Sequence, residues 1–269
     1  MLWREYCIFG LPLRPADIVN GAALAVIPAR LGSTRLPRKP LHLIAGRPLV
    51  EWVWRRVIAC PQFDLVVIAT DSEEIAEHGR SIGAQVELTS RDHPSGTDRV
   101  AEVARRLRYR GYPIVVNVQG DEPFVDPAHL AEAIGLVREG WEVGTVASPI
   151  ESREELRSAS VVKVVRGRDG GALYFSRSPI PHARDAEPAA ADFASELFLR
   201  HIGIYAYEAR SLQRWVELPE GELERVERLE QLRPLAGGMR IGVAVARGGV
   251  GGVDTLEDAE KAEERLRAS

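Results

Sequence analysis

The sequence predicts an α/β fold: a mostly parallel sheet with helices on both faces and an inserted β-rich lobe. From Leu24 onward, short runs rich in β-branched residues alternate with stretches of helical character, as expected for parallel strands joined by helices. The run VVNVQ at 115–119 is apolar at nearly every position, which is typical of a central strand covered on both faces. No internal repeat or clean linker divides the 269 residues, so one domain over 23–269 is the simplest organisation.

The first half of the domain is expected to alternate strands with helices in a regular order. The strands are predicted at Leu24–Ala29, Leu65–Thr70, Gln85–Leu88, Ile114–Gln119 and Val143–Pro149. The helices are predicted at Leu49–Cys60, Ser72–Ile82, Thr97–Leu107 and Pro127–Glu139. Ser72 is a favourable N-cap, and Asp126-Pro127 has the pattern of an N-cap followed by proline at the first helical position.

The pattern changes after Pro149, where an inserted lobe is predicted over about 150–207. Val161–Val165 and Ala172–Ser176, separated by a glycine-rich turn, are expected to form a hairpin. Residues 178–196 are rich in Pro, Ala and Asp and are predicted to form a long surface loop. The remaining elements are expected to be a strand at Leu199–Tyr207, a helix at Leu223–Arg233, a strand at Ile241–Ala246 and a final helix at Thr255–Ala268.

The composition excludes several classes of protein. Hydrophobic residues make up 45% and charged residues 28%, as in an ordinary globular protein, and no apolar run is long enough to span a bilayer. The net charge of −4 gives no overall attraction to nucleic acid. The 2 cysteines fit no disulfide framework or zinc cluster and suit a reducing cytoplasm. Residues 1–22 are expected to be an extension outside the fold, disordered or loosely packed.

A basic loop follows the first strand. Between Asp17 and Glu51 the chain carries no acid and several cations, which are Arg30, Arg35, Arg38, Lys39 and Arg47. The loop IPARLGSTRLPRKP at 27–40 begins at the carboxyl end of a strand, where open α/β sheets bind ligands, and Gly32 and Ser33 would let backbone amides approach a phosphate. It lacks the spacing of a Walker A loop or a dinucleotide fingerprint. The pattern indicates a small anionic ligand, with a solvated basic loop as the alternative.

A pair of carboxylates closes the VVNVQ strand. Asp121 and Glu122 follow Gln119-Gly120, and charge at the end of a buried strand is costly unless it is paired or bound to a metal. Magnesium held by one or two carboxylates and by substrate phosphates fits this position. The alternative is that Asp121 only caps the following turn.

Several motifs in register carry a resemblance to a known family. They are IPARxxSTRLPxKPL at 27–41, ATDSEEI at 69–75, HPSGTDR at 93–99, NVQGDEP at 117–123, VKVV at 162–165, ALYFSRSPIP at 172–181, FLRHIGIYAY at 198–207, LEQLRPL at 229–235 and GVDTLED at 252–258. Together they resemble the 3-deoxy-manno-octulosonate (Kdo) cytidylyltransferases over residues 24–269. The resemblance implies a fold like that of the nucleotide-diphospho-sugar transferases.

The resemblance implies transfer of CMP from CTP to the anomeric hydroxyl of Kdo, with release of pyrophosphate, for lipopolysaccharide biosynthesis. The hydroxyl attacks the α-phosphorus and pyrophosphate leaves in line, which chiefly requires alignment and charge neutralisation. Arg30 and Lys39 are assigned to the triphosphate, with Ser33 in the same loop, while Arg35 could serve either the triphosphate or the sugar carboxylate. The nucleotide is further expected to contact Thr70, Asp71, Ser95, Gly96, Arg99 and Gln119, with turn and capping roles as the alternative.

The resemblance also implies a magnesium cofactor held by Asp121 and Asp254. Asp254 precedes the last helix and could instead be its N-cap, a role that Thr255 could also take. A bound metal would lower the pKa of the sugar hydroxyl, and no side chain is a compelling general base.

For the sugar, the resemblance points to Arg35, Gln119, His201, Tyr205, Glu230 and Gln231. His201 and Tyr205 should face the same side of a strand roughly 13 Å apart. A hydrogen-bonded sheet face is the alternative for this pair. Glu230 and Gln231 are adjacent on a predicted helix and should point in different directions.

The resemblance implies a homodimer formed through the inserted lobe, in the cytoplasm, without nucleic acid or membrane insertion. Two alternatives remain open: the same chemistry on another 2-keto sugar acid, such as 8-amino-Kdo or a sialic acid, and a CTP-binding regulator without turnover. The presence of Arg30, Lys39, Asp121 and Asp254 together favours an enzyme, since sensing CTP would not require both metal-binding aspartates.

Overall fold

The computed structural model describes residues 22–32, 35–185, 187–193, 195–248 and 252–268. The strands are β1 (Ala23–Ala29), β2 (Leu43–Ile44), β3 (Arg47–Pro48), β4 (Leu65–Thr70), β5 (Gln85–Leu88), β6 (Ile114–Asn117), β7 (Val143–Pro149), β8 (Lys163–Arg166), β9 (Ala172–Ser176), β10 (Leu199–Glu208) and β11 (Ile241–Val245). The helices are α1 (Leu49–Ile58), α2 (Glu73–Ser81), α3 (Gly96–Arg105), α4 (Pro127–Arg138), α5 (Arg153–Arg157), α6 (Ala190–Phe193), α7 (Ala209–Glu217), α8 (Glu222–Glu227), α9 (Leu232–Ala236) and α10 (Leu256–Ala268), and a 3-10 helix spans Lys39–Leu41. The predicted extension lies outside the described residues except for Ala22, which is buried.

The main sheet has the strand order β11-β7-β10-β6-β1-β4-β5. β1 pairs in parallel with β4 and β6, β4 pairs in parallel with β5, and β7 with β11. β10 runs antiparallel to both of its neighbours, β6 and β7, so the other strands of this path share one direction. The predicted mostly parallel sheet is confirmed.

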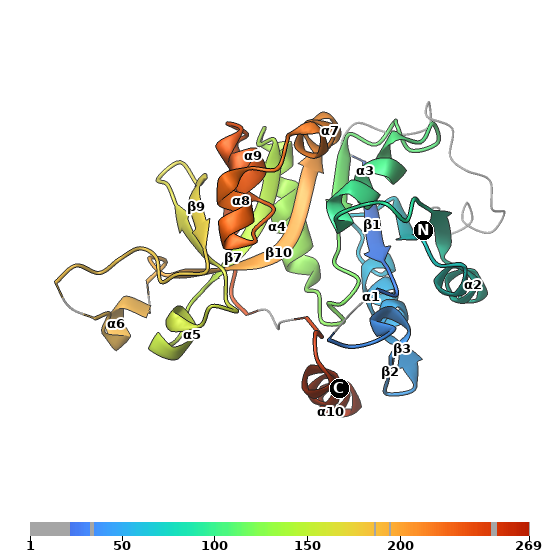
Figure 1. Cartoon of the computed structure of the whole chain (residues 1–269), viewed down its shortest axis with the longest axis horizontal. Helices are drawn as coiled ribbons and strands as arrows, with labels where there is room; N and C mark the ends of the chain where they lie inside the picture. Colours follow the sequence, from blue (N-terminus) through green and yellow to red (C-terminus); the bar gives the residue numbers. More distant parts are fainter. Residues whose placement is uncertain (1–21, 33–34, 186, 194, 249–251, 269) are drawn as a thin grey trace.

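Helices cover both faces of this sheet (Figure 1). Leu24 and Val26 of β1 belong to a core cluster that includes side chains of α3 and α7. Ala25 and Ile27 belong to a second cluster, with side chains of α1, α2 and α4. Because successive strand residues point to opposite faces, β1 is buried on both sides, as its apolar sequence requires.

Some elements differ from the prediction. The expected helix Leu223–Arg233 is two short helices, α8 and α9, because Arg228 adopts a left-handed conformation with φ 55° and ends α8. The strand expected to reach Gln119 ends at Asn117. Helix α7 was not predicted, nor were the short helices α5 and α6 or the β2–β3 hairpin.

The predicted hairpin of β8 and β9 is present and pairs with the first residues of β10. β10 itself, which the prediction included in the lobe, lies in the main sheet between β6 and β7, so the predicted lobe boundary at about 207 is wrong. Lys163 of β8 is 0% exposed, and its Nζ donates to the carbonyl oxygens of Ser158, Val161 and Arg177 at 2.9, 2.7 and 2.5 Å. These bonds use all three donors of the ammonium. They fasten the segment before β8 to the end of β9, from which the connection carrying α6 projects away from the sheet (Figure 1).

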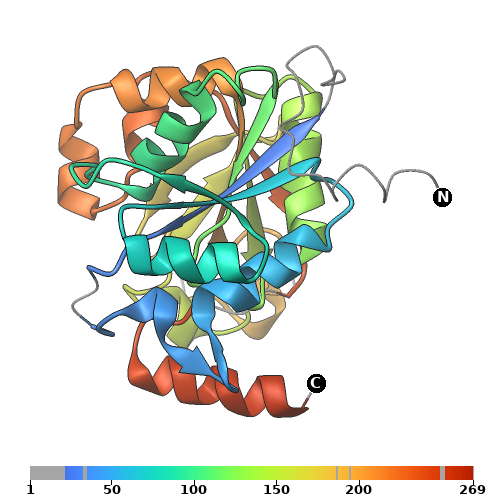
Figure 2. The same cartoon turned by 90° about the vertical axis from the view of Figure 1, so that its right-hand side faces the viewer.

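A separate small core joins the C-terminal helix to the start of the domain. Leu36 and Ile44 pack in one cluster with Ala259 and Ala262 of α10. Figure 2 shows α10 beside the β2–β3 hairpin. Because Leu36 belongs to the basic loop, this core holds the end of the chain against that loop.

Candidate active site

The parallel strands β1, β4 and β6 end at the same edge of the sheet, and a segment with predicted site residues follows each of them. β1 leads into the basic loop, β4 into Asp71, and β6 into the turn that contains Asp121. Ligands of open α/β sheets bind in the crevice outside the carboxyl ends of such strands. This edge is therefore the candidate site.

The Lys39 ammonium joins two aspartates that are distant in the sequence. Its Nζ lies 2.5 Å from Oδ2 of Asp121 and 2.9 Å from Oδ1 of Asp254. Arg35 adds a second cation, with Nη1 3.1 Å from Oδ2 of Asp254. The Lys39 side chain is 16% exposed, against 43% for Asp254 and 66% for Arg35, so the ammonium is the enclosed centre of the cluster.

Backbone contacts position the turn that carries Asp121. A Cβ on Gly120 would lie 2.6 Å from the carbonyl oxygen of Pro28, so only glycine lets the turn approach β1 this closely. The Val253 N–H donates to the Asp121 carbonyl at 2.8 Å. The segment before α10 is thus bonded directly to the turn after β6, and the small core beneath α10 holds both near the basic loop.

Thr255, rather than Asp254, is the N-cap of α10. Its hydroxyl accepts from the Asp258 N–H at 3.2 Å, while Oδ2 of Asp258 accepts from the N–H groups of Asp254 and Thr255 at 3.1 and 2.9 Å. This reciprocal arrangement is a capping box. It leaves the Asp254 carboxylate to the two cations of the cluster.

The charges of the cluster fit a divalent cation. Burial alone would lower the pKa of Lys39, but Asp121 and Asp254 outweigh burial and raise it, so the group stays an ammonium. In the described part of the chain, no group of 3 or more His, Cys, Asp or Glu side chains is placed to hold a metal. Two carboxylates that share one cation position nevertheless suit Mg²⁺, which commonly takes its remaining ligands from phosphate and water.

The second carboxyl of the predicted pair behaves differently. Burial, together with the charge of Asp121, raises the pKa of Glu122 to about 8. Glu122 is therefore mostly protonated at neutral pH.

Two of the residues predicted to enclose the cytidine, Asp71 and Arg99, are bonded to each other. The guanidinium of Arg99, which is 2% exposed, donates to Oδ2 of Asp71 at 2.9 Å and also bonds to the Thr89 hydroxyl. Thr70 is fully buried, and its hydroxyl accepts from the Ser72 N–H at 3.1 Å. Arg99 thus holds the segments after β4 and β5 together, which is a positioning role.

Ser95 connects the predicted nucleotide residues with the predicted sugar residues. It is the N-cap of α3, and its hydroxyl lies 3.2 Å from Oε1 of Glu230. The same carboxylate oxygen accepts from Nε1 of Trp215 at 3.2 Å. Desolvation raises the pKa of Glu230. A Cβ on Gly96 would lie 3.4 Å from the Pro28 side chain, so the start of α3 lies against the end of β1.

His201 and Tyr205 are in ring contact, whereas regular strand spacing predicts that they are well separated. Their ring centroids are 5.3 Å apart, because the pairing of β10 with β7 shifts between Ile202 and Tyr205 and the strand is not regularly extended there. Nε2 of His201 lies 2.9 Å from the Thr145 hydroxyl, and burial lowers the pKa of His201 to about 3. The Tyr205 ring meets Trp215 edge-on, which links this pair to Glu230.

The remaining predicted residues are placed as follows. Ser33 lies outside the described residues. Arg30 directly follows β1 and is exposed. The Gln119 carbonyl accepts a backbone hydrogen bond in the turn after β6. Glu230 and Gln231 lie in the break between α8 and α9, not on one helix as expected, and Gln231 is buried.

Sequence reasoning missed Trp215 and Thr145. Trp215 lies on α7, whose buried residues Ser211, Leu212 and Trp215 have helical spacing, so the signal was available. Thr145 lies in the buried strand β7, and threonine is an ordinary strand residue. Only the fold reveals that Thr145 meets His201.

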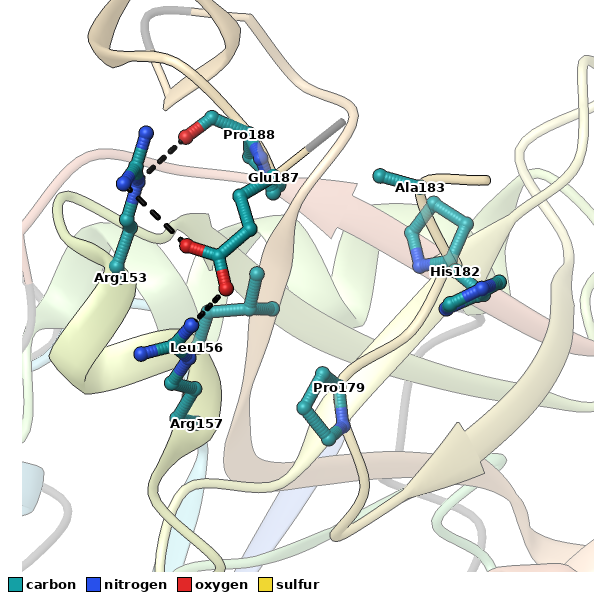
Figure 3. A pocket seen from close by; sticks show the side chains of 9 residues that line it. Arg153, Leu156, Arg157, Pro179, His182, Ala183, Glu187 and Pro188 are labelled. Carbon is teal, nitrogen blue, oxygen red and sulfur yellow. Dashed lines mark hydrogen bonds and ion pairs between the residues drawn. The ribbon is translucent and has the colours of Figure 1, made fainter. Parts of the chain in front are cut away.

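Residues of α5 and of the connection after β9 line a cavity of about 170 Å³ (Figure 3). Glu187 forms an ion pair with Arg153 at 3.4 Å and a second one with Arg157. Nε of Arg153 also donates to the Pro188 carbonyl at 2.7 Å. The cations of this cavity are already paired, and none of the predicted site residues lines it, so it is distinct from the candidate active site.

Comparisons with known proteins identify the family. The sequence model of the cytidylyltransferase family matches residues 24–241. The 3-deoxy-manno-octulosonate cytidylyltransferase of Gemmatimonas aurantiaca is 50% identical over 89% of this chain and 92% of its own, and that of Geobacter sulfurreducens is 46% identical over 90% and 98%. A solved CMP:2-keto-3-deoxy-manno-octonic acid synthetase complexed with CTP has a TM-score of 0.84 and 38% identity, covering 92% of this chain and 99% of its own. The chain therefore belongs to the 3-deoxy-manno-octulosonate cytidylyltransferase family.

Proposed function

We propose that this chain transfers CMP from CTP to the anomeric hydroxyl of Kdo and releases pyrophosphate, with magnesium as its cofactor. The observation that carries the proposal is the single cation position shared by Asp121 and Asp254 beside the basic loop. The names of relatives at 46–50% identity, and the CTP held by the similar solved structure, support the same reaction.

The chain's own cations suit a triphosphate. Lys39 is a compact ammonium that can stabilise charge developing on the leaving pyrophosphate. Arg35 is 66% exposed and sits at the rim of the cluster, where it can meet a phosphate or the sugar carboxylate. Mg²⁺ held by Asp121 and Asp254 would neutralise the phosphates and lower the pKa of the attacking hydroxyl.

The residues around the cluster would align the two substrates. Arg99 fixes Asp71 and the segment after β5, where the cytidine is proposed to lie. On the sugar side, Glu230, Tyr205 and His201 form one connected group through Trp215. Burial raises the pKa of Tyr205 and lowers that of His201, so both are neutral at pH 7 and suit the hydroxyls of a sugar.

Assembly and location are part of the same proposal. We expect a homodimer that works in the cytoplasm and supplies lipopolysaccharide biosynthesis, as the family resemblance implies. Within the described residues, no helix is both long and apolar enough to cross a membrane.

The experiment that tests this function is pyrophosphate release with different substrate pairs. CTP would be compared with ATP, GTP and UTP, and Kdo with 8-amino-Kdo and a sialic acid. We expect turnover with CTP and Kdo that exceeds every other pair. Turnover with CTP and a sialic acid, but not with Kdo, would contradict the proposed acceptor.

A further inference from the structure

The Lys39 ammonium lies where the proposed function needs a metal ion. Nζ is 2.5 Å from an oxygen of Asp121 and 2.9 Å from an oxygen of Asp254. A divalent cation on the same two carboxylates would need those oxygens at about 2 Å. Two cations held between the same pair of oxygens would repel each other.

We propose that Lys39 is a built-in counter-cation of the nucleotide-free protein. It holds Asp121 and Asp254 together, competes with the divalent metal for them, and leaves them when the triphosphate of CTP binds. This inference rests on the proposed function. Its consequence is that metal binds weakly to the free protein and enters the site together with the nucleotide.

The charge count of the cluster supports this competition. Lys39 and Arg35 balance the two carboxylates in the structure. Adding a divalent cation while both stay in place would leave two excess positive charges in a partly enclosed site, which is unfavourable. A bound triphosphate removes the conflict, because it offers Lys39 new anionic oxygens.

The backbone around Lys39 is fixed while its side chain is long enough to move. The 3-10 helix that begins at Lys39 is closed by bonds from the Leu41 N–H to the Arg38 carbonyl at 2.9 Å and from the His42 N–H to the Lys39 carbonyl at 3.1 Å. Pro40 is buried. The ammonium sits on a flexible four-carbon stem, so Nζ can pass from the aspartates to a phosphate without a change of fold.

The neighbouring residue Arg38 provides a matched control. Its guanidinium is 58% exposed and pairs with Glu74, away from the aspartates. Arg38→Met removes the same charge from the same loop as Lys39→Met. A general effect of lost positive charge would therefore appear in both variants, whereas competition for the aspartates would appear only in Lys39→Met.

The test is calorimetric titration of nucleotide-free protein with Mg²⁺ alone, repeated with Mn²⁺ and its paramagnetic resonance signal. The proteins are the wild type, Lys39→Met, Lys39→Gln, Arg38→Met and the double variant Lys39→Met/Asp254→Asn. We expect both Lys39 variants to bind metal about tenfold or more tightly than the wild type. Arg38→Met should bind like the wild type, and the double variant should lose the gain.

Thermal melts provide a second readout that does not depend on catalytic turnover. In chelator, Lys39→Met should melt below the wild type because its two carboxylates lose their shared cation, and Mg²⁺ should close that gap.

Equal or weaker metal binding by both Lys39 variants would overturn the inference, as would a gain that persists with Asp254→Asn or that also appears in Arg38→Met. Wild-type turnover of CTP and Kdo tests the proposed function separately: an active wild type with unchanged metal affinity in the Lys39 variants overturns only the role of Lys39.

Discussion

The Ser95 hydroxyl lies 3.2 Å from Oε1 of Glu230, although the two residues are 135 positions apart in the sequence. Ser95 is the N-cap of α3 in the proposed cytidine segment, and Glu230 lies between α8 and α9 in the proposed sugar segment. Nε1 of Trp215 donates to the same oxygen. One contact therefore connects the two halves of the proposed substrate site.

Glu230→Gln tests this connection. The amide keeps the shape of the side chain but removes a carboxylate whose pKa is raised by desolvation, so we expect a KM for Kdo at least about tenfold higher with a melting temperature that is unchanged or slightly higher. The exposed Glu222, in α8, offers the control Glu222→Gln. Steady-state kinetics with Kdo varied at saturating CTP give the answer, and an unchanged KM would remove Glu230 from the sugar site.

Asp258 is expected to act on the site through Asp254. Its carboxylate accepts from the N–H groups of Asp254 and Thr255, so Asp258→Ala should destabilise the start of α10 by about 1 kcal/mol. Because Asp254 then loses an anchor, kcat at limiting magnesium should fall about tenfold. Glu257→Ala, which removes only an exposed pair with Lys261, is the control. Equal activity of the two variants across a magnesium titration would contradict this role.

The buried His201 is expected to make the stability of the folded protein depend on pH. Its pKa is about 3 in the fold because of burial, against an ordinary value of 6.5. Below pH 6.5 the unfolded chain takes up a proton that the folded protein does not, so His201 lowers stability progressively as pH falls toward 3 and has no such effect above 6.5.

His201→Gln should remove this dependence. Relative to the wild type, the variant should gain about 1–2 kcal/mol of unfolding free energy when the pH is lowered from 7.5 to 5. Urea unfolding at the two pH values measures the difference, with His182→Gln as the control because that histidine is exposed. A wild-type-to-variant difference that stays constant with pH would show that His201 titrates normally.

Lys39 is expected to matter for catalysis as well as for metal binding. Lys39→Met should lower kcat/KM for CTP by about 10²-fold through the loss of one charge-assisted contact. Lys39→Arg should restore only part of this, because a planar guanidinium does not replace a compact ammonium. Initial rates of pyrophosphate release decide the matter, and full activity of Lys39→Met would make Lys39 dispensable.

Local sequence patterns were sufficient for most of the fold. The alternation of strands with helices placed β4 and β5 at their observed bounds, since each is a short run bounded by turn or capping residues. The break at Arg228 left no local signal, because a left-handed residue at a helix end is usually glycine or asparagine. The shift of pairing in β10, which brings His201 against Tyr205, depends on its neighbour β7 and cannot be read from β10 alone.

The sequence predicted which residues form the candidate site but not how they are arranged in space. The acid-free loop and the carboxylate after a buried strand pointed to anion and metal binding, and the family resemblance added Asp254. The convergence of Asp121 and Asp254 on Lys39 depends on the small core between α10 and the basic loop. Such a contact between distant segments follows from tertiary packing, which local periodicity does not encode.

Asp121 and Asp254 are expected to act as one unit on a shared cation. The most direct measurement is a double-mutant cycle on kcat for pyrophosphate release from CTP and Kdo at saturating magnesium, with Asp185→Asn, a 94% exposed residue, as the control. Asp121→Asn should lower kcat by about 10²–10⁴-fold, or roughly 3–5 kcal/mol, and Asp254→Asn by nearly as much. The double variant should be little worse than either single one, because groups that act together are strongly non-additive. Losses that multiply would mean that the two aspartates act independently, and would contradict the shared site.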